Sequence, residues 1–138
     1  MSNYLKKKAK RVLQTDSILI IQDSPSVNAM LKFRLERAGF AIDTAETGEE
    51  GIEKTKVSHY HLILLDYNLP GINGSQVCQV LKKRKDTKDI PILFISAKDE
   101  DKLSQITTEA GADGYIGLPF EGKKFLEKIT NTLKIRRP

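Results

Sequence analysis

The sequence predicts a single α/β domain in which helices cover both faces of a parallel β-sheet. Its clearest segment is residues 61–71, where four consecutive aliphatic residues run into Asp66 and the turn residues Pro70 and Gly71 follow. An uninterrupted apolar run of this length is typical of a strand buried on both faces, as in parallel sheets. Similar runs alternate with segments of helical apolar spacing, and 138 residues suit one compact domain.

Five segments of the chain are expected to form strands. They are residues 17–22, 40–45, 62–66, 90–96 and 113–118. The first, third and fourth are continuous aliphatic runs, as expected of strands buried on both faces. The second includes the charged residue Asp43, so we expect it at an edge of the sheet.

A helical pattern follows each predicted strand. Ser24 and Pro25 match the start of the first helix, and Gly39 stops it. The apolar stripe of this helix consists of Val27, Met30, Leu31, Leu35 and Ala38. Thr47 and Glu50 predict a capping box for the second helix, which runs to about residue 57.

The last three helices have clear limits as well. Asn73 is the expected N-cap of the third helix, and Gly111 ends the fourth. Pro119 breaks the last strand, and a closing helix follows it. The inward residues of that helix are Phe125, Leu126, Ile129 and Leu133.

The net charge of +5 comes from the two ends of the chain, because residues 18–133 carry a net charge of about −2. A nucleic-acid partner is therefore not expected. We divide the chain into a basic N-terminal extension at residues 1–16, a domain at residues 17–135 and a tail at residues 136–138. The extension is either a short amphipathic helix or a frayed tail.

Cysteine content and hydropathy indicate a cytoplasmic protein. The single Cys78 cannot form an internal disulfide and suits a small core position in a reducing compartment. No segment approaches the ~18 apolar residues that a membrane helix needs, and no apolar run follows the basic N-terminus. A membrane partner is not expected.

Polar residues follow three of the predicted strands at their carboxyl ends. Asp23, Asp66 and Ser96 occupy these positions, and this edge of a parallel sheet is where ligands bind. Two neighbouring carboxylates repel each other unless a cation lies between them, and their oxygens suit Mg²⁺. A carboxylate can also attack phosphorus and carry an acyl phosphate. The pattern therefore predicts a site for a divalent cation and a phosphoryl group.

Four segments carry a resemblance to a known family. They read Ile-Leu-Ile-Ile-Gln-Asp-Ser-Pro-Ser-Val, Leu-Ile-Leu-Leu-Asp-Tyr-Asn-Leu-Pro-Gly-Ile-Asn-Gly, Pro-Ile-Leu-Phe-Ile-Ser-Ala and Gly-Ala-Asp-Gly-Tyr-Ile-Gly-Leu-Pro-Phe. In this order they resemble the response-regulator receiver domain of two-component signalling, over residues 17–134. The resemblance implies a doubly wound, flavodoxin-like (βα)5 fold with strand order 2-1-3-4-5.

The resemblance also implies a role for each matching residue. Asp66 would accept a phosphoryl group from a phosphohistidine on a sensor histidine kinase or a histidine phosphotransfer protein. Asp23, Asp66 and the backbone carbonyl of Asn68 would bind Mg²⁺ or Mn²⁺. The protein would then be a signalling phosphoacceptor and not an enzyme, and it has no phosphate-cradling Gly-rich loop.

Further residues would report the phosphorylation to a partner. Ser96 would donate its hydroxyl to the phosphoryl group, and Tyr115 would change rotamer with it. Pro119 would follow a cis peptide bond. Residues 101–135 would form the face that a downstream protein, or a second copy of the chain, recognises.

Two positions depart from the family pattern. Gln22 stands where the family usually has an acidic residue, and Leu118 stands where it has a lysine that contacts the phosphoryl group. We therefore expect slower phosphorylation of Asp66, because a positioned cation typically contributes ~10²-fold or more in rate. Lys98 is a candidate substitute for the missing cation, although a lysine in a loop is usually only solvated.

Simpler interpretations stay open for the same residues. Ser96 would then cap a turn, Tyr115 would pack at an edge, and Asp23 would cap the first helix. Leu118 would seal the pocket. The chain would then be a pseudo-receiver, a protein-binding module that acts without phosphorylation. His59 and His61 are a poor metal pair, since both precede the central strand and lie at the end of the sheet opposite Asp66.

Overall fold

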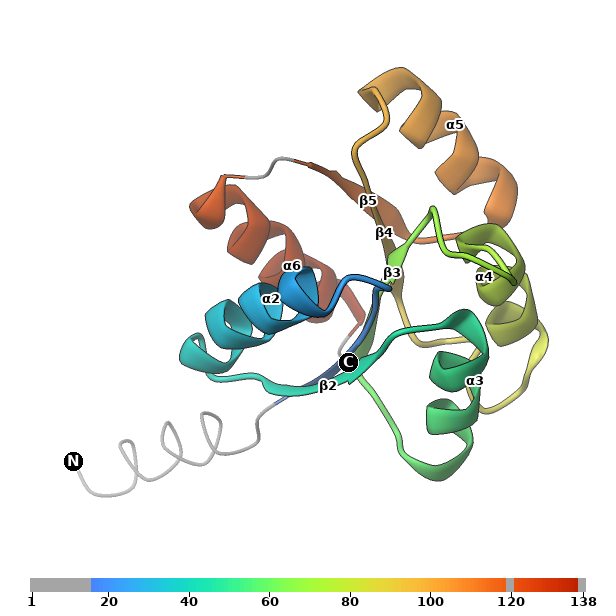
Figure 1. Ribbon diagram of the computed structural model, residues 1–138, viewed down its shortest axis with the longest axis horizontal. Coiled ribbons are helices and arrows are strands. Elements are labelled where there is room, and N and C mark those ends of the chain that lie inside the picture. Colours follow the sequence, from blue (N-terminus) through green and yellow to red (C-terminus); the bar gives the residue numbers. More distant parts are fainter. Residues whose placement is uncertain (1–15, 119–120, 137–138) are drawn as a thin grey trace.

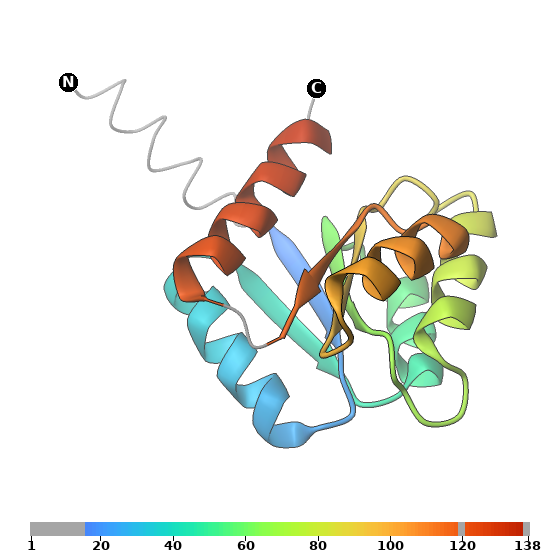
Figure 2. The ribbon, with the colours of Figure 1, turned by 90° about the horizontal axis from the view of Figure 1, so that it is seen from above.

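The computed structural model describes residues 16–118 and 121–136 and contains five strands and five helices (Figures 1 and 2). The strands are β1 (Ser17–Ile21), β2 (Ala41–Ala45), β3 (Leu62–Asp66), β4 (Ile92–Ser96) and β5 (Gly114–Gly117). The helices are α2 (Pro25–Arg37), α3 (Gly48–Val57), α4 (Gly74–Lys83), α5 (Glu100–Ala110) and α6 (Gly122–Arg136). All strand pairs are parallel, in the order β2-β1-β3-β4-β5. The predicted fold class and strand order are confirmed.

The sheet separates two helical layers. Helices α2 and α6 cover one face, and α3, α4 and α5 cover the other (Figure 1). Each face has its own buried apolar cluster, because side chains alternate between the two faces along a strand. In β1, Ile18 and Ile20 belong to the cluster under α2 and α6, whereas Leu19 and Ile21 belong to the cluster under α3, α4 and α5.

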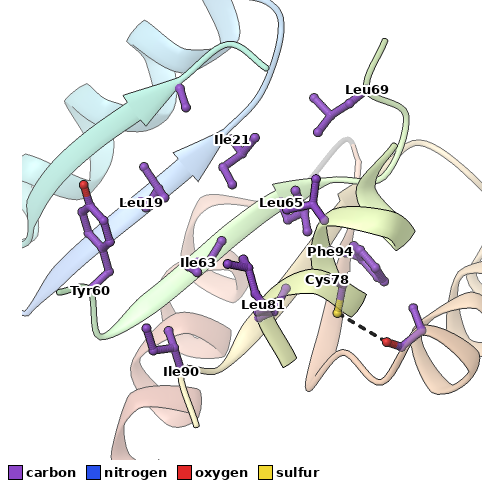
Figure 3. Close-up of a cluster of buried hydrophobic side chains, with 14 of the residues drawn as sticks. Leu19, Ile21, Tyr60, Ile63, Leu65, Leu69, Cys78, Leu81, Ile90 and Phe94 are labelled. Carbon is purple, nitrogen blue, oxygen red and sulfur yellow. Dashed lines mark hydrogen bonds between the residues drawn. The ribbon is translucent and has the colours of Figure 1, made fainter. Parts of the chain in front are cut away.

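The cluster under α3, α4 and α5 is shown in Figure 3. Phe94 is fully buried in it, and its ring meets Tyr67 edge-to-face with the ring centroids 5.5 Å apart. Cys78 is fully buried there and its Sγ donates to the carbonyl of Ala110 at 3.5 Å, as expected of a core residue. Burial raises the pKa of the Cys78 thiol to about 11, so the reactive thiolate is scarce at neutral pH.

Helix α2 buries a polar residue that the apolar stripe did not predict. Leu31 and Leu35 are buried as expected, but Met30 is 41% exposed and Ala38 is exposed. Asn28 is 6% exposed, and its Nδ2 donates to the backbone oxygen of Gln22 at 2.6 Å. This hydrogen bond ties the first turns of α2 to the end of β1.

The helix caps follow the predictions with two corrections. Ser24 caps α2 and accepts from the amide of Val27 at 3.3 Å, so Asp23 is not the N-cap. Thr47 accepts from the amide of Glu50, but the Glu50 carboxylate accepts from the amide of Glu46 and not from that of Thr47. The predicted capping box of α3 is therefore only half formed. Asn73 and Gln76 form a complete capping box at the start of α4.

β2 lies at the edge of the sheet, as its charged residue Asp43 predicted. There Asp43 accepts from the Tyr60 hydroxyl at 2.6 Å and from Lys54 Nζ at 2.9 Å. Burial disfavours the Asp43 carboxylate, but these two partners outweigh burial and lower its pKa. Burial and the Asp43 charge raise the pKa of Tyr60 to about 12.

The two ends of the chain and one loop lie partly outside the described residues. The predicted N-terminal extension lies outside them except for Asp16, and so do the last two residues of the predicted tail. The peptide bond before Pro119, predicted to be cis, also lies outside them. Helix α6 extends to Arg136, one residue beyond the predicted boundary at 135. Within the described part of the chain, no helix combines the length and apolarity needed to cross a bilayer.

Candidate functional site

The candidate site lies at the carboxyl edge of the central strands β1 and β3. Asp66 is the last residue of β3, and the residues before it are fully buried whereas its own side chain is partly exposed. Its Oδ1 accepts from the backbone amide of Asn68 at 3.0 Å. The strand therefore delivers a fixed carboxylate to the surface of the sheet edge.

Asp66 and Asp23 converge at this edge. Burial is the main cause that raises the pKa of Asp66, and the negative charge of Asp23 and a hydrogen bond with its side chain raise it further. Hydrogen bonds from the Asn68 amide and the Gln22 side chain act in the opposite direction. The Asp23 charge is one of the causes of the upward pKa shift of Asp66, because neighbouring carboxylates disfavour each other's ionisation.

Gln22, the residue before Asp23, is buried, at 6% exposure. Its backbone amide donates to the carbonyl of Ala45 at 2.9 Å, which continues the β1–β2 pairing by one residue. Its Oε1 accepts from the backbone amide of Ser24 at 3.1 Å. This hydrogen bond holds the side-chain amide of Gln22 against the start of the loop that leads to α2.

The end of β4 brings Ser96 and Lys98 to the same edge. Ser96 is 2% exposed, and its Oγ accepts from the amide of Lys98 at 3.1 Å, which is the turn contact of the simpler interpretation. The Lys98 Nζ lies 5.8 Å from the ring centroid of Tyr67, the residue after Asp66. The Lys98 ammonium therefore lies near the end of β3, on one side of the Tyr67 ring.

Tyr115 and Leu118 engage other partners. The Tyr115 hydroxyl donates to Oε1 of Glu100 at 3.3 Å, and its ring packs against the cluster under α3, α4 and α5. Leu118 is partly buried and packs against the cluster under α2 and α6, and its amide donates to the Ser96 carbonyl at 2.8 Å. The aliphatic side chain at position 118 extends the core and brings no charge to the sheet edge.

A pair of carboxylates suits Mg²⁺ better than it suits a metal ion whose ligands all come from protein side chains. Among residues 16–118 and 121–136, no group of three or more His, Cys, Asp or Glu side chains is placed to hold a metal ion. Mg²⁺ is usually held by one or two carboxylates and keeps several waters. Burial is the main reason that the pKa of Asp66 is raised, and the Asp23 charge raises it further; a bound cation would offset that charge.

His59 and His61 lie at the opposite end of the sheet, as predicted. Both precede β3, whereas Asp66 ends it. Their ring centroids are 5.3 Å apart, and Nδ1 of His61 accepts from the backbone amide of Ser17 at 3.0 Å. This nitrogen of His61 therefore takes part in a hydrogen bond that joins the residue before β3 to the first residue of β1.

The chain was compared with known proteins. Residues 18–130 match the sequence model of the response regulator receiver domain, which is most of the chain. The chain belongs to the response regulator receiver domain family. Receiver domains of this family are part of two-component signalling systems.

Curated relatives of this receiver domain are longer regulators. The transcriptional regulatory protein ResD of Bacillus subtilis (strain 168) is 37% identical over 117 residues, which are 85% of this chain and 48% of ResD. The response regulator ArlR of Staphylococcus aureus (strain Mu50 / ATCC 700699) is 34% identical over 123 residues, which are 88% of this chain and 53% of ArlR. The chain spans about half the length of these relatives.

Solved structures of similar proteins show the same fold. The response regulator TrrA of Thermotoga maritima, in complex with Mg²⁺ and BeF, is 34% identical with a TM-score of 0.76, over 85% of this chain and 98% of TrrA. A CheY-like receiver domain protein of Methanospirillum hungatei JF-1 is 27% identical with a TM-score of 0.81, over 88% of this chain and 96% of that protein. Receiver domains similar to this one therefore bind Mg²⁺.

Sequence reasoning missed two contributors to this receiver site. Asn28 was not singled out, although an asparagine on the inward face of a helix requires a buried hydrogen-bond partner. Gln22 was identified only as a departure from the family. It is buried, and its Oε1 accepts from the backbone amide of Ser24, an orientation that residue type alone does not reveal.

Gly74 lets the start of α4 pack directly on the backbone at the end of β3. A Cβ at this position would lie 2.6 Å from the backbone oxygen of Asp66 and 2.7 Å from Cα of Tyr67. We expect Gly74→Ala to lower the free energy of unfolding by about 1–3 kcal/mol, because backbone atoms must shift. Gly117→Ala is the matched control, since a Cβ there meets nothing within 4 Å. Urea unfolding that gives equal midpoints for the two variants would contradict this packing.

Proposed function

We propose that this receiver domain accepts a phosphoryl group on Asp66, with Mg²⁺ or Mn²⁺ held by Asp23, Asp66 and the backbone carbonyl of Asn68. The observation that carries the proposal is that β1 and β3 are parallel neighbours, which brings Asp23 and Asp66 to the same edge of the sheet. Burial raises the pKa of Asp66, and the Asp23 charge raises it further. The proposed donor is a phosphohistidine on a sensor histidine kinase or a histidine phosphotransfer protein.

The chemistry needs one nucleophile and the neutralisation of charge. An oxygen of the Asp66 carboxylate forms a bond to phosphorus as the bond between phosphorus and the imidazole nitrogen of the donor breaks. The electron pair of that bond stays on the imidazole, and Asp66 becomes an acyl phosphate. A bound divalent cation would neutralise the developing charge on the phosphoryl oxygens. The Asn68 amide holds Asp66 Oδ1 during the attack.

Signal output would require two side chains to exchange partners. The Ser96 hydroxyl accepts from Lys98 N–H and has its own proton to donate, so it can reach a phosphoryl oxygen by rotating. Tyr115 would leave Glu100 and follow Ser96 inward. The face of residues 101–135 would then change shape for a downstream protein or a second copy of the chain.

The test is labelling of the wild-type chain with acetyl phosphate, with and without Mg²⁺, followed by intact-mass measurement. We expect metal-dependent labelling of the wild type, none of Asp66→Asn, and at least about tenfold slower labelling of Asp23→Asn. Labelling of Asp66→Asn at the wild-type rate would refute Asp66 as the acceptor. A wild type that takes no label from acetyl phosphate or from any phosphorylated kinase would refute the proposal itself.

A second candidate function is favoured by the aliphatic residue at position 118. Leu118 packs with the core and supplies no cation for a phosphoryl group. The domain would then be a pseudo-receiver that binds its partner without phosphorylation. Mg²⁺ titration followed by NMR separates the two candidates. The phosphoacceptor should bind the ion and lose that affinity in Asp23→Asn, whereas the module needs no binding at all.

A further inference from the structure

Asn73 is followed by glycine, and this pair of residues has a reactivity of its own, separate from the phosphoryl chemistry of Asp66. The side chain of an asparagine can react with the backbone amide of the next residue and form a five-membered succinimide ring. Glycine in the second position favours the reaction, because it has no Cβ to obstruct the ring and its backbone turns freely. Of the five asparagines in the sequence, Asn73 alone precedes a glycine.

Hydrogen bonds hold both reacting groups apart in the folded chain. The reacting nitrogen is the backbone amide of Gly74, which donates to the carbonyl of Tyr67 at 3.1 Å. The Oδ1 of Asn73 accepts from the amide of Gln76 at 2.9 Å, and the Asn73 amide donates to Gln76 Oε1 at 3.0 Å. The Gly74 nitrogen is therefore committed to the end of β3, and the Asn73 side chain is committed to α4.

Gly74 also has little room to move. It is buried at the start of α4, and a Cβ built on it would lie 2.6 Å from the backbone oxygen of Asp66. Asn73 is exposed, so water has access to its side chain. Ring closure therefore requires the first turn of α4 to open and Gly74 to leave the backbone of β3.

We propose that the Asn73–Gly74 pair is a site of spontaneous deamidation, and that opening of the first turn of α4 controls the reaction. After a base removes the amide proton of Gly74, the nitrogen bonds to Cγ of Asn73. The side-chain nitrogen takes up a proton from solvent and leaves as ammonia. Water then adds to one of the two carbonyl carbons of the succinimide and opens the ring, which gives aspartate or isoaspartate at position 73. The reaction does not depend on phosphorylation of Asp66.

The two products have different consequences for the end of β3. Aspartate is as good an N-cap as asparagine, so the first product keeps the start of α4. Isoaspartate runs the main chain through the former side chain and lengthens it by one carbon atom before Gly74. With this longer connection, Gly74 cannot keep both its hydrogen bond to Tyr67 and its close approach to the backbone of Asp66.

The first test compares deamidation of the folded chain with that of the chain unfolded in urea, followed by peptide mapping and mass spectrometry. We expect Asn73 to react faster in urea than every other asparagine, and folding to slow it by at least about tenfold. Hydrogen exchange of the Gly74 amide measures the same opening, so its protection factor should match that slowing within about threefold. Equal rates in the folded and unfolded chain, or no preference for Asn73 in urea, would overturn the inference.

The second test opens the first turn of α4 without changing the reacting pair. Gln76→Ala removes the side-chain half of the capping box. We expect about fivefold faster deamidation of the folded chain, the factor that a helix cap typically provides, and an unchanged rate in urea. Gln79→Ala is the matched control, because Gln79 is exposed on the same helix and lies outside the capping box. Equal rates for the two folded variants would show that the first turn of α4 does not control the reaction.

Discussion

Leu118→Lys is expected to raise the rate of acetyl-phosphate labelling of Asp66 by about 10²-fold, because a positioned cation stabilises the charge that develops on a transferring phosphoryl group. Leu118 follows directly after β5, and its amide bonds to the carbonyl of Ser96. The four-carbon stem of a lysine can lie over the apolar cluster where the leucine packs, while its ammonium reaches the polar edge.

Leu118→Met is the control for this substitution. It keeps the apolar contact with the cluster under α2 and α6 and adds no charge, so its labelling rate should stay near that of the wild type. Equal rates for the lysine and methionine variants, measured by intact mass over a time course, would show that position 118 has no access to the phosphoryl group. The pseudo-receiver interpretation would then gain support.

Phe94→Ala should lower the free energy of unfolding by about 3–5 kcal/mol. Phe94 is fully buried in β4, and its ring contacts that of Tyr67, the residue after Asp66. Removing the ring leaves a cavity that the surrounding strands cannot fill. This loss is a large fraction of the stability of a typical domain, so urea or thermal unfolding will detect it.

Phe33→Ala is the comparison for Phe94→Ala. Phe33 is 61% exposed on α2, where Arg37 lies over its ring at 5.5 Å. A surface substitution of this kind should change the free energy of unfolding by no more than about 1 kcal/mol. A similar loss of stability in the two variants would mean that the core under α3, α4 and α5 is packed more loosely than the structure shows.

The fold was predictable because its signals are local and strong. The aliphatic runs of β1, β3 and β4 are buried on both faces, and Asp43 correctly marked β2 as an edge strand. The order β2-β1-β3-β4-β5 came from the family resemblance, since the alternation of strands and helices alone leaves several orders open. Element ends differ by one or two residues, as is usual where helices and strands fray.

The site was predictable only in part, because contacts between side chains depend on orientation. Asp66 and Asp23 converge because β1 and β3 are neighbours with a common direction, which follows from topology. The orientation of the Gln22 side chain depends on a backbone amide two residues further along the chain, and no sequence pattern encodes it. The prediction that Met30 faces the core was wrong for a similar reason. Helix α2 turns the polar Asn28 inward and leaves Met30 exposed, whereas hydrophobicity alone would favour the methionine for burial.

The close approach of Gly74 to the backbone of Asp66 restricts how this region of the protein can vary in length. The amide of Gly74 also donates to the carbonyl of Tyr67 at 3.1 Å, so both ends of the connection from β3 to α4 are fastened to each other. Insertions or deletions between residues 67 and 73 would have to separate these contacts, and they would displace Asp66 as they did so. Tolerated length changes are therefore expected in the other connections, away from the carboxyl end of β3.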